Sequence, residues 1–342
     1  MKNEHKNPAP KSFAGRTKTD EFSPDLSVVI AGVKFKNPVI AASGTFGFGR
    51  EYSQLFDVSC LGGICTKGLT LHPRAGNNGS RIWETPAGLL NSIGLENPGI
   101  EVFLEKELPL LCSRGTVVIA NLSGSTIEEY TDGAKLLNES SVDMIELNIS
   151  CPNVKTGGMA FGLEPQAAAS VTKPVRRACS HKPLIVKLSP NAPNPARVAE
   201  SCVNAGADAI SLVNTFKAMA IDIKKRRPVF DNISAGLSGP AIRPIALRMV
   251  WELYETLAGM KHAARRTAAN KDSLPAIPII GMGGIACAED ALEFLMAGAA
   301  AIQVGSATFA RPPAMLEIIS GIENYMRENG YTEINEISIR RY

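Results

Sequence analysis

The stretch "PIIGMGGIACAEDALEFLMAGAAAIQVGSA", residues 278–307, contains a complete strand–helix–strand unit. Its first and last seven residues are short apolar runs that end in small residues. Between them, apolar residues recur three or four positions apart, which predicts an amphipathic helix. The two runs do not alternate polar and apolar residues, so both are predicted to be strands covered on both faces, as in a parallel sheet.

The same alternation of strand and helix recurs along the chain. Amphipathic stretches such as "TIEEYTDGAKLLNES" separate the apolar runs and place apolar residues on one helical face. Eight alternations in about 300 residues predict a (β/α)8 TIM barrel, and we assign residues 26–342 to it. A doubly wound open sheet is the alternative, although its GxGxxG turn is not found. The other six runs are at 38–43, 62–68, 116–124, 144–150, 184–190 and 209–215.

Composition restricts the class of protein. The net charge of +3 gives no case for a nucleic-acid partner. No apolar run approaches the roughly 20 residues that cross a bilayer, so no membrane segment is expected. Residues 1–25 are polar and lack the apolar core of a signal peptide. We expect a flexible tail there, with a basic targeting or docking arm as the alternative.

Cysteine and histidine usage points to an organic cofactor. Seven cysteines are an odd number spread along the chain, which favours a reducing compartment and a cytoplasmic location. The four histidines show no metal-ligand spacing, so no metal site is predicted. Redox chemistry in this protein would therefore need a bound organic cofactor.

The predicted strand ends carry mostly polar or small residues. Catalytic residues of a barrel lie at the carboxyl ends of its strands. A lysine within an apolar strand, as Lys187 is in "LIVKLSP", is costly to bury unless an anion meets it. We therefore expect a polar site formed by the residues at these ends: Ser43, Thr66, Lys67, Asn121, Asn148, Lys187, Asn214, Thr215, Gly283, Gly284, Gly305 and Ser306.

The last two strand ends predict a phosphate site. "GMGG" and "VGSA" are turns of small residues, each expected to lead into a helix. Bare backbone N–H groups and a helix N-terminus can bind a phosphate at this corner of a barrel. Two plain glycine turns are the alternative. A phosphate there suits a mononucleotide such as FMN, and Lys187 could place positive charge against the pyrimidine edge of the flavin.

Ordered motifs from Leu26 to Ile322 resemble the class 1 dihydroorotate dehydrogenases, and among them the B-type catalytic subunits. The glycine pair after the cysteine–proline–asparagine run fits the B type better than the A type. The motifs that carry the resemblance are "AASGTFGFGREY", "TKGLTLHPRAGN", "NSIGLENPG", "NISCPNVKTGGMAFG", "LVNT", "GLSGPAIRP", "GMGGI" and "VGSA".

The resemblance implies an FMN-dependent oxidation of dihydroorotate to orotate in pyrimidine biosynthesis. Cys151 would be the catalytic base. The FMN site would comprise Ser43, Thr66, Lys67, Asn121, Asn148, Lys187, Val213, Gly239, Gly283, Gly284, Gly305 and Ser306. The substrate site would comprise Lys67, Asn91, Ser92, Ile93, Gly94, Leu95, Asn148, Asn214 and Thr215.

A base at Cys151 also accords with the stretch "ELNISCPNVKTGG", residues 146–158. A thiolate can take the proton from ring carbon 5 while the flavin accepts a hydride from carbon 6. The loop that begins at Pro152 could close over the ring and exclude water, with Gly157 and Gly158 as flexible points.

The resemblance further implies a homodimer of catalytic chains, assembled as a heterotetramer with a subunit that carries FAD and a [2Fe–2S] cluster and passes electrons to NAD. Three alternatives remain: an FMN-dependent dihydropyrimidine dehydrogenase, a fumarate-using A-type enzyme, and a barrel isomerase or lyase whose phosphate site holds its substrate.

Two other segments are interpreted as surface features, the basic run 223–228 as a solvated loop and 261–275 as an extension of a helix.

Overall fold

The computed structural model describes residues 22–150, 159–267 and 277–339. Eight parallel strands close into a barrel in which each strand pairs with the preceding and following strand of the set, which confirms the predicted TIM barrel. The barrel strands are β3 (Val39–Ala41), β4 (Gly63–Cys65), β7 (Val117–Leu122), β8 (Met144–Asn148), β9 (Leu184–Lys187), β10 (Ala209–Leu212), β15 (Ile279–Met282) and β16 (Ala301–Val304).

Each predicted apolar run contains one of these strands. Except for Val117 at the start of β7, every residue of the barrel strands is buried. One face of each strand packs into the barrel and the other packs under the helices. This two-sided burial explains why the runs show no alternation of polar and apolar residues.

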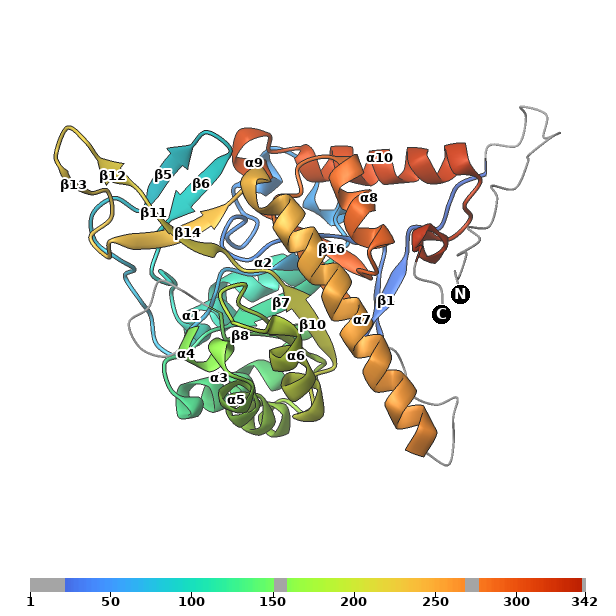
Figure 1. Cartoon of the computed structure of the whole chain (residues 1–342), viewed down its shortest axis with the longest axis horizontal. Helices are drawn as coiled ribbons and strands as arrows, with labels where there is room; N and C mark the ends of the chain where they lie inside the picture. The colour runs from blue at the N-terminus through green and yellow to red at the C-terminus, as the bar shows by residue number, and fades with distance from the viewer. Residues whose placement is uncertain (1–21, 151–158, 268–276, 340–342) are drawn as a thin grey trace, which may run out of the picture.

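Helices cover the outside of the barrel, and the helix α7 (Arg243–Thr267) runs obliquely across it (Figure 1). Side-chain caps begin two of them: Thr126 accepts from the backbone N–H of Glu129, and Asn194 accepts from that of Arg197. The longer helices are α3 (Ile127–Asn138), α5 (Pro165–Ala178), α6 (Pro195–Asn204), α7 (Arg243–Thr267), α8 (Ala288–Met296) and α10 (Ala314–Asn329).

Short helical segments fill the remaining connections. After β3 the chain forms the 3₁₀ turns η1 (Tyr52–Gln54) and η2 (Val58–Cys60) in place of a long helix. One helical segment precedes β7, and it consists of α1 (Ile100–Val102), the π-turn η3 (Phe103–Glu107) and α2 (Leu108–Cys112). The others are α4 (Met159–Leu163), η4 (Pro240–Ile242), α9 (Ala307–Ala310) and η5 (Ile334–Ile337).

A four-stranded antiparallel sheet, which the sequence analysis did not predict, extends from the barrel (Figure 1). Its order is β11–β14–β6–β5, and residues far apart in the chain pair in it, such as Asn91 with Gly236. The strands are β5 (Ile82–Thr85), β6 (Gly88–Asn91), β11 (Phe216–Met219) and β14 (Ser234–Ser238).

Two small hairpins complete the described chain. β1 (Val28–Ile30) pairs with β2 (Val33–Phe35), and β12 (Ile221–Asp222) pairs with β13 (Arg227–Pro228). Residues 223–227 are exposed, which confirms the basic run as a solvated segment. Helix α7 includes residues 261–267, which confirms the predicted helical extension for this part of 261–275. Residues 268–275 and residues 1–21 of the predicted tail lie outside the described residues. No helix in the described ranges has the length and apolar character needed to span a membrane.

Candidate active site

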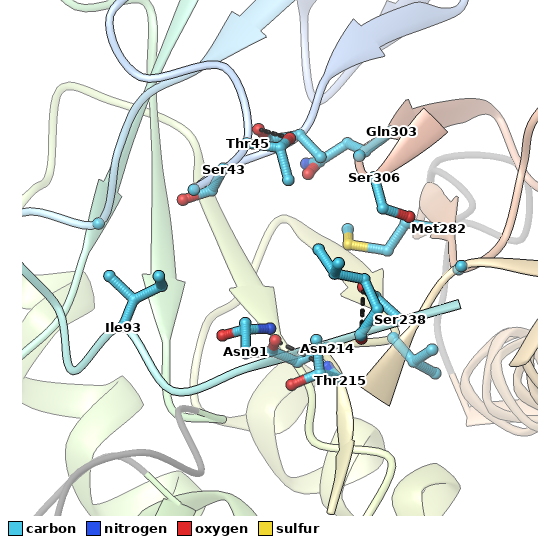
Figure 2. Close-up of a pocket in the computed structure, with 18 of the residues that line it drawn as sticks. Ser43, Thr45, Asn91, Ile93, Asn214, Thr215, Ser238, Met282, Gln303 and Ser306 are labelled. Atoms are coloured by element: carbon cyan, nitrogen blue, oxygen red, sulfur yellow. Dashed lines mark hydrogen bonds between the residues drawn. The ribbon is translucent and has the colours of Figure 1, made fainter. Parts of the chain in front are cut away.

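A cavity of about 250 Å³ lies where the carboxyl ends of the barrel strands meet the four-stranded sheet. In Figure 2, Asn91, Asn214 and Thr215 lie on one side of this cavity, and Gln303 and Ser306 lie on the other. The predicted site residues that the structure brings together here are Ser43, Lys67, Asn91, Ile93, Gly94, Leu95, Asn148, Lys187, Val213, Asn214, Thr215, Gly239, Gly283, Gly284, Gly305 and Ser306.

Three predicted residues lie behind the cavity wall. The Thr66 hydroxyl accepts from the backbone N–H of Asn121 at 3.1 Å, and both residues are fully buried. The Ser92 hydroxyl accepts from the side-chain amide of Asn77 at 3.1 Å. These residues support the wall of the cavity without lining it.

Cys151, the predicted base, and the loop that follows it at 152–158 lie outside the described residues. The chain leading to this position is described and well anchored. The buried Tyr130 hydroxyl of α3 donates to the carbonyl of Asn148 at 2.8 Å, at the carboxyl end of β8. The base therefore stays a prediction, made for a residue three positions beyond this anchor.

A chain of hydrogen bonds joins the amides on one side of the cavity. Asn148 donates from Nδ2 to Asn121 Oδ1 at 3.3 Å and accepts at Oδ1 from the Ser150 hydroxyl at 2.8 Å. Asn214 Nδ2 in turn donates to the Ser150 hydroxyl at 2.8 Å. Each amide therefore has a defined direction, and the backbone N–H of Thr215 donates to Asn214 Oδ1 at 2.8 Å.

Lys187 projects into the barrel and meets a buried carboxylate, that of Glu146 on β8. The distance from Lys187 Nζ to Glu146 Oε1 is 3.6 Å, and the side chains are 5% and 0% exposed. Glu146 Oε1 also accepts from Asn121 Nδ2 at 2.7 Å and from the Cys65 thiol at 3.2 Å. Its Oε2 accepts from the Ser211 hydroxyl at 2.7 Å and from Gln303 Nε2 at 2.9 Å.

These contacts decide the charge state of Glu146. Burial raises the pKa of its carboxyl, but the Lys187 ammonium and the hydrogen bonds donated to it outweigh burial, so that the pKa lies below the ordinary value. The carboxylate is therefore ionised at neutral pH. Burial, reinforced by the nearby Glu146 charge, raises the pKa of Cys65 well above its usual range and keeps it a thiol.

Lys67, the second cation of the cavity, follows β4. Burial lowers the pKa of its ammonium, and the Glu96 carboxylate partly offsets this effect. Its backbone N–H donates to the carbonyl of Gly47 at 3.0 Å, which fixes the start of the side chain. A half-buried ammonium in a polar cavity is suited to meet an anionic group of a ligand.

The two glycine turns lead into their helices differently. Helix α9 begins directly after Ser306, as expected, but α8 begins only at Ala288. The Asp290 carboxylate already accepts hydrogen bonds from the backbone N–H groups of Ala286 and Cys287. The start of α8 is therefore occupied by the protein's own carboxylate. The backbone around Gly283, Gly284 and Gly305 remains as the lining of this corner.

Comparison with known proteins agrees with the barrel and the polar cavity. The sequence profile of the family described as dihydroorotate dehydrogenase matches residues 25–326. The chain belongs to the dihydroorotate dehydrogenase family.

Curated relatives match nearly the whole chain. A protein of Petrotoga mobilis is 57% identical over 92% of this chain and 98% of its own length. Proteins of Geotalea daltonii and Caldicellulosiruptor bescii are each 52% identical over 92% of this chain, covering 97% and 98% of their own lengths. All three are named dihydroorotate dehydrogenase B (NAD(+)), catalytic subunit.

For this dehydrogenase family member, sequence reasoning missed Glu146 and Gln303. The sequence does carry a signal for Glu146, because an acidic residue within the apolar run "MIELNIS" is as costly to bury as the lysine in "LIVKLSP". Gln303 stands likewise within the apolar run of β16. Its Oε1 is buried without a hydrogen-bond partner among the described residues, and the side chain lines the cavity.

Proposed function

We propose that this chain oxidises dihydroorotate to orotate, a step of pyrimidine biosynthesis. The observation that carries the proposal is the cavity itself, which combines amides, two lysines and glycine turns at the carboxyl end of the barrel. In the reaction, carbon 5 loses a proton and carbon 6 loses a hydride, and a double bond forms between them. The family to which the chain belongs and the names of its relatives support this assignment.

The amides and Lys67 suit the substrate. A pyrimidine ring presents alternating C=O and N–H groups, which side-chain amides can match as paired donors and acceptors. Asn91, Asn148 and Asn214 line the cavity and are assigned to this role. Lys67, with the backbone around Gly94, is assigned to the substrate carboxylate.

We assign FMN as the cofactor, which accepts the hydride when it is bound. Two features of the cavity suit it. The buried Gln303 Oε1 has no partner in the described structure and can accept from a ring N–H. Gly305 has no side chain, so its backbone is bare where it lines the cavity; a Cβ placed there would already be in van der Waals contact with Ala42 Cβ at 3.6 Å. Lys187 and the glycine turns would hold the ring and the phosphate respectively.

Cys151 is assigned as the base that removes the proton from carbon 5. A free thiol has a pKa near 8.5, so a modest stabilisation of the thiolate makes it a competent base at neutral pH. The chain reaches Cys151 directly after Ser150, whose hydroxyl contacts both Asn148 and Asn214. These contacts of Ser150, the residue that precedes Cys151 in the sequence, support the assignment of the cysteine to the same reaction.

We further propose that electrons leave through a second protein. The relatives are named catalytic subunits of NAD(+)-dependent enzymes. An electron-transfer subunit with FAD and a [2Fe–2S] cluster would carry electrons from FMN to NAD, in a heterotetramer built on a homodimer of this chain.

The experiment is anaerobic reduction of the purified protein. Mass spectrometry should identify FMN, and dihydroorotate should bleach the flavin absorbance. A dihydropyrimidine without the carboxylate is the control, because Lys67 should make it a poor reductant. Protein that takes up no flavin on reconstitution, or that is reduced faster by the control compound, would contradict the proposal.

A further inference from the structure

Glu146 is the buried group that links the two sides of the cavity. It does not line the cavity, yet it contacts Lys187 and Gln303, which do. Its carboxylate is fully buried and receives contacts from five side chains of five different barrel strands. So many donors exceed what a carboxylate needs for burial alone, where two or three hydrogen bonds already stabilise the ionised form.

The charge of Glu146 fixes the orientation of Gln303. An ionised carboxylate only accepts hydrogen bonds, so the side-chain NH₂ of Gln303 must face it, at 2.9 Å from Oε2. The carbonyl oxygen of the same amide therefore faces away from Glu146. This oxygen is the buried Oε1 for which the described structure holds no partner, and it offers an acceptor to a bound ring.

The same carboxylate balances Lys187. The ammonium lies 3.6 Å from Oε1 and is nearly fully buried at the cavity edge. In such surroundings charges interact strongly, because solvent does not screen them. The net field at the cavity is thus that of a buried ion pair, much weaker than the field of a lone ammonium.

We propose that Glu146 is a positioning residue, which sets the reduction potential of the flavin by balancing the charge of Lys187 and by turning the Gln303 carbonyl toward the ring. This inference rests on the proposed function, because it requires a flavin in the cavity. Reduction adds negative charge to the ring, so the buried carboxylate opposes reduction and the ammonium favours it.

The test is the flavin midpoint potential of purified variants, measured by anaerobic spectroelectrochemistry. Glu146→Gln removes the opposing charge and should raise the midpoint potential by about 30 mV for two electrons. This shift corresponds to a change on the order of tenfold in the ratio of reduced to oxidised flavin. Lys187→Met should lower it. The double variant should lie near the wild type, because the two removed charges cancel.

Asp143→Asn is the matched control. It also removes one negative charge, but from an exposed side chain just before β8, at the end of the strand that lies away from the cavity. The flavin potential should therefore be unchanged. An unchanged or lower potential in flavin-loaded Glu146→Gln would overturn the inference, as would an equal shift in the control.

The double variant also covers the case in which Glu146→Gln fails to fold. Removing one partner of a buried ion pair is strongly destabilising, whereas replacing both is better tolerated. The comparison is then between the wild type and the double variant, whose potentials should agree, and a clearly lower potential in the double variant would overturn the inference. Wild-type protein that binds no flavin would contradict the proposed function itself, which separates the two failures.

Discussion

At the scale of single residues, we predict that the assigned reaction depends most directly on Cys151. Replacement by Ala should leave FMN bound but slow flavin reduction by dihydroorotate about 10²- to 10⁴-fold, the usual contribution of a positioned base. Anaerobic stopped-flow absorbance measures this rate. The wild-type rate should rise with pH as the thiol ionises.

Cys151→Ser serves as the comparison for size and polarity. Its hydroxyl ionises far less readily than a thiol, so it should restore little activity near neutral pH. If the Ala variant instead reduced its flavin at nearly the wild-type rate, another group would be the base.

The residues at the strand ends could be predicted because their type conflicts with their surroundings. Lys187 is a charge within an apolar run, which predicts a role for it, and it lines the cavity. Glu146 and Gln303 each stand two residues before a recognised position, Asn148 and Gly305, on the same face of their strands. Their position does not mark them, because each lies before the last residue of its strand, whereas the functional residues of a barrel are expected at the carboxyl ends.

At the scale of elements, the turn after β16 provides a test of phosphate binding. A Cβ at Gly305 would meet only ordinary contacts, so Gly305→Ala should keep the stability of the wild type within about 0.5 kcal/mol. The added methyl group would occupy space beside Ala42 and Thr45, which line the cavity. FMN affinity should therefore fall about tenfold or more, equivalent to ~1.4 kcal/mol.

Titration of the apoprotein with FMN, followed by fluorescence quenching, gives the affinity, and thermal unfolding gives the stability. Gly259→Ala on the exposed face of α7 is the matched control, since its Cβ would meet nothing within 4 Å. It should bind FMN as the wild type does. Undiminished affinity in Gly305→Ala would mean that the phosphate is bound elsewhere.

The four-stranded sheet shows where element-level prediction ends. Strand β6 pairs with β14 across a sequence separation of more than a hundred residues, for instance Asn91 with Gly236. Strands of four or five residues with partly exposed faces carry little periodic signal. The barrel strands were predictable because burial on both faces makes each run apolar, whereas the sheet depends on pairing between distant segments.

At the scale of the whole molecule, the proposed division into two proteins predicts how electrons leave. The cavity residues are assigned to FMN and a pyrimidine, so a nicotinamide would need a binding surface of its own. The isolated chain should reduce a small dye when dihydroorotate is added, yet reduce NAD poorly. Absorbance assays of dye and NADH measure both reactions.

Co-expression with a partner that carries FAD and an iron–sulfur cluster should restore NAD reduction, with the two proteins co-purifying. Rapid NADH formation by the isolated chain would argue against a separate subunit. Efficient turnover with fumarate and no partner would instead indicate A-type behaviour.

The ion pair between Glu146 and Lys187 also bears on how this barrel can diverge. A change at either position alone leaves a buried charge without its counterion, which is strongly destabilising, whereas a joint change to two neutral residues of similar volume avoids that state. The two positions are 41 residues apart in the chain but lie on adjacent strands, with Glu146 opposite Ile185 and Asn148 opposite Lys187. In an alignment of homologous sequences they should therefore covary, and a lineage that has lost the acid should have lost the lysine as well.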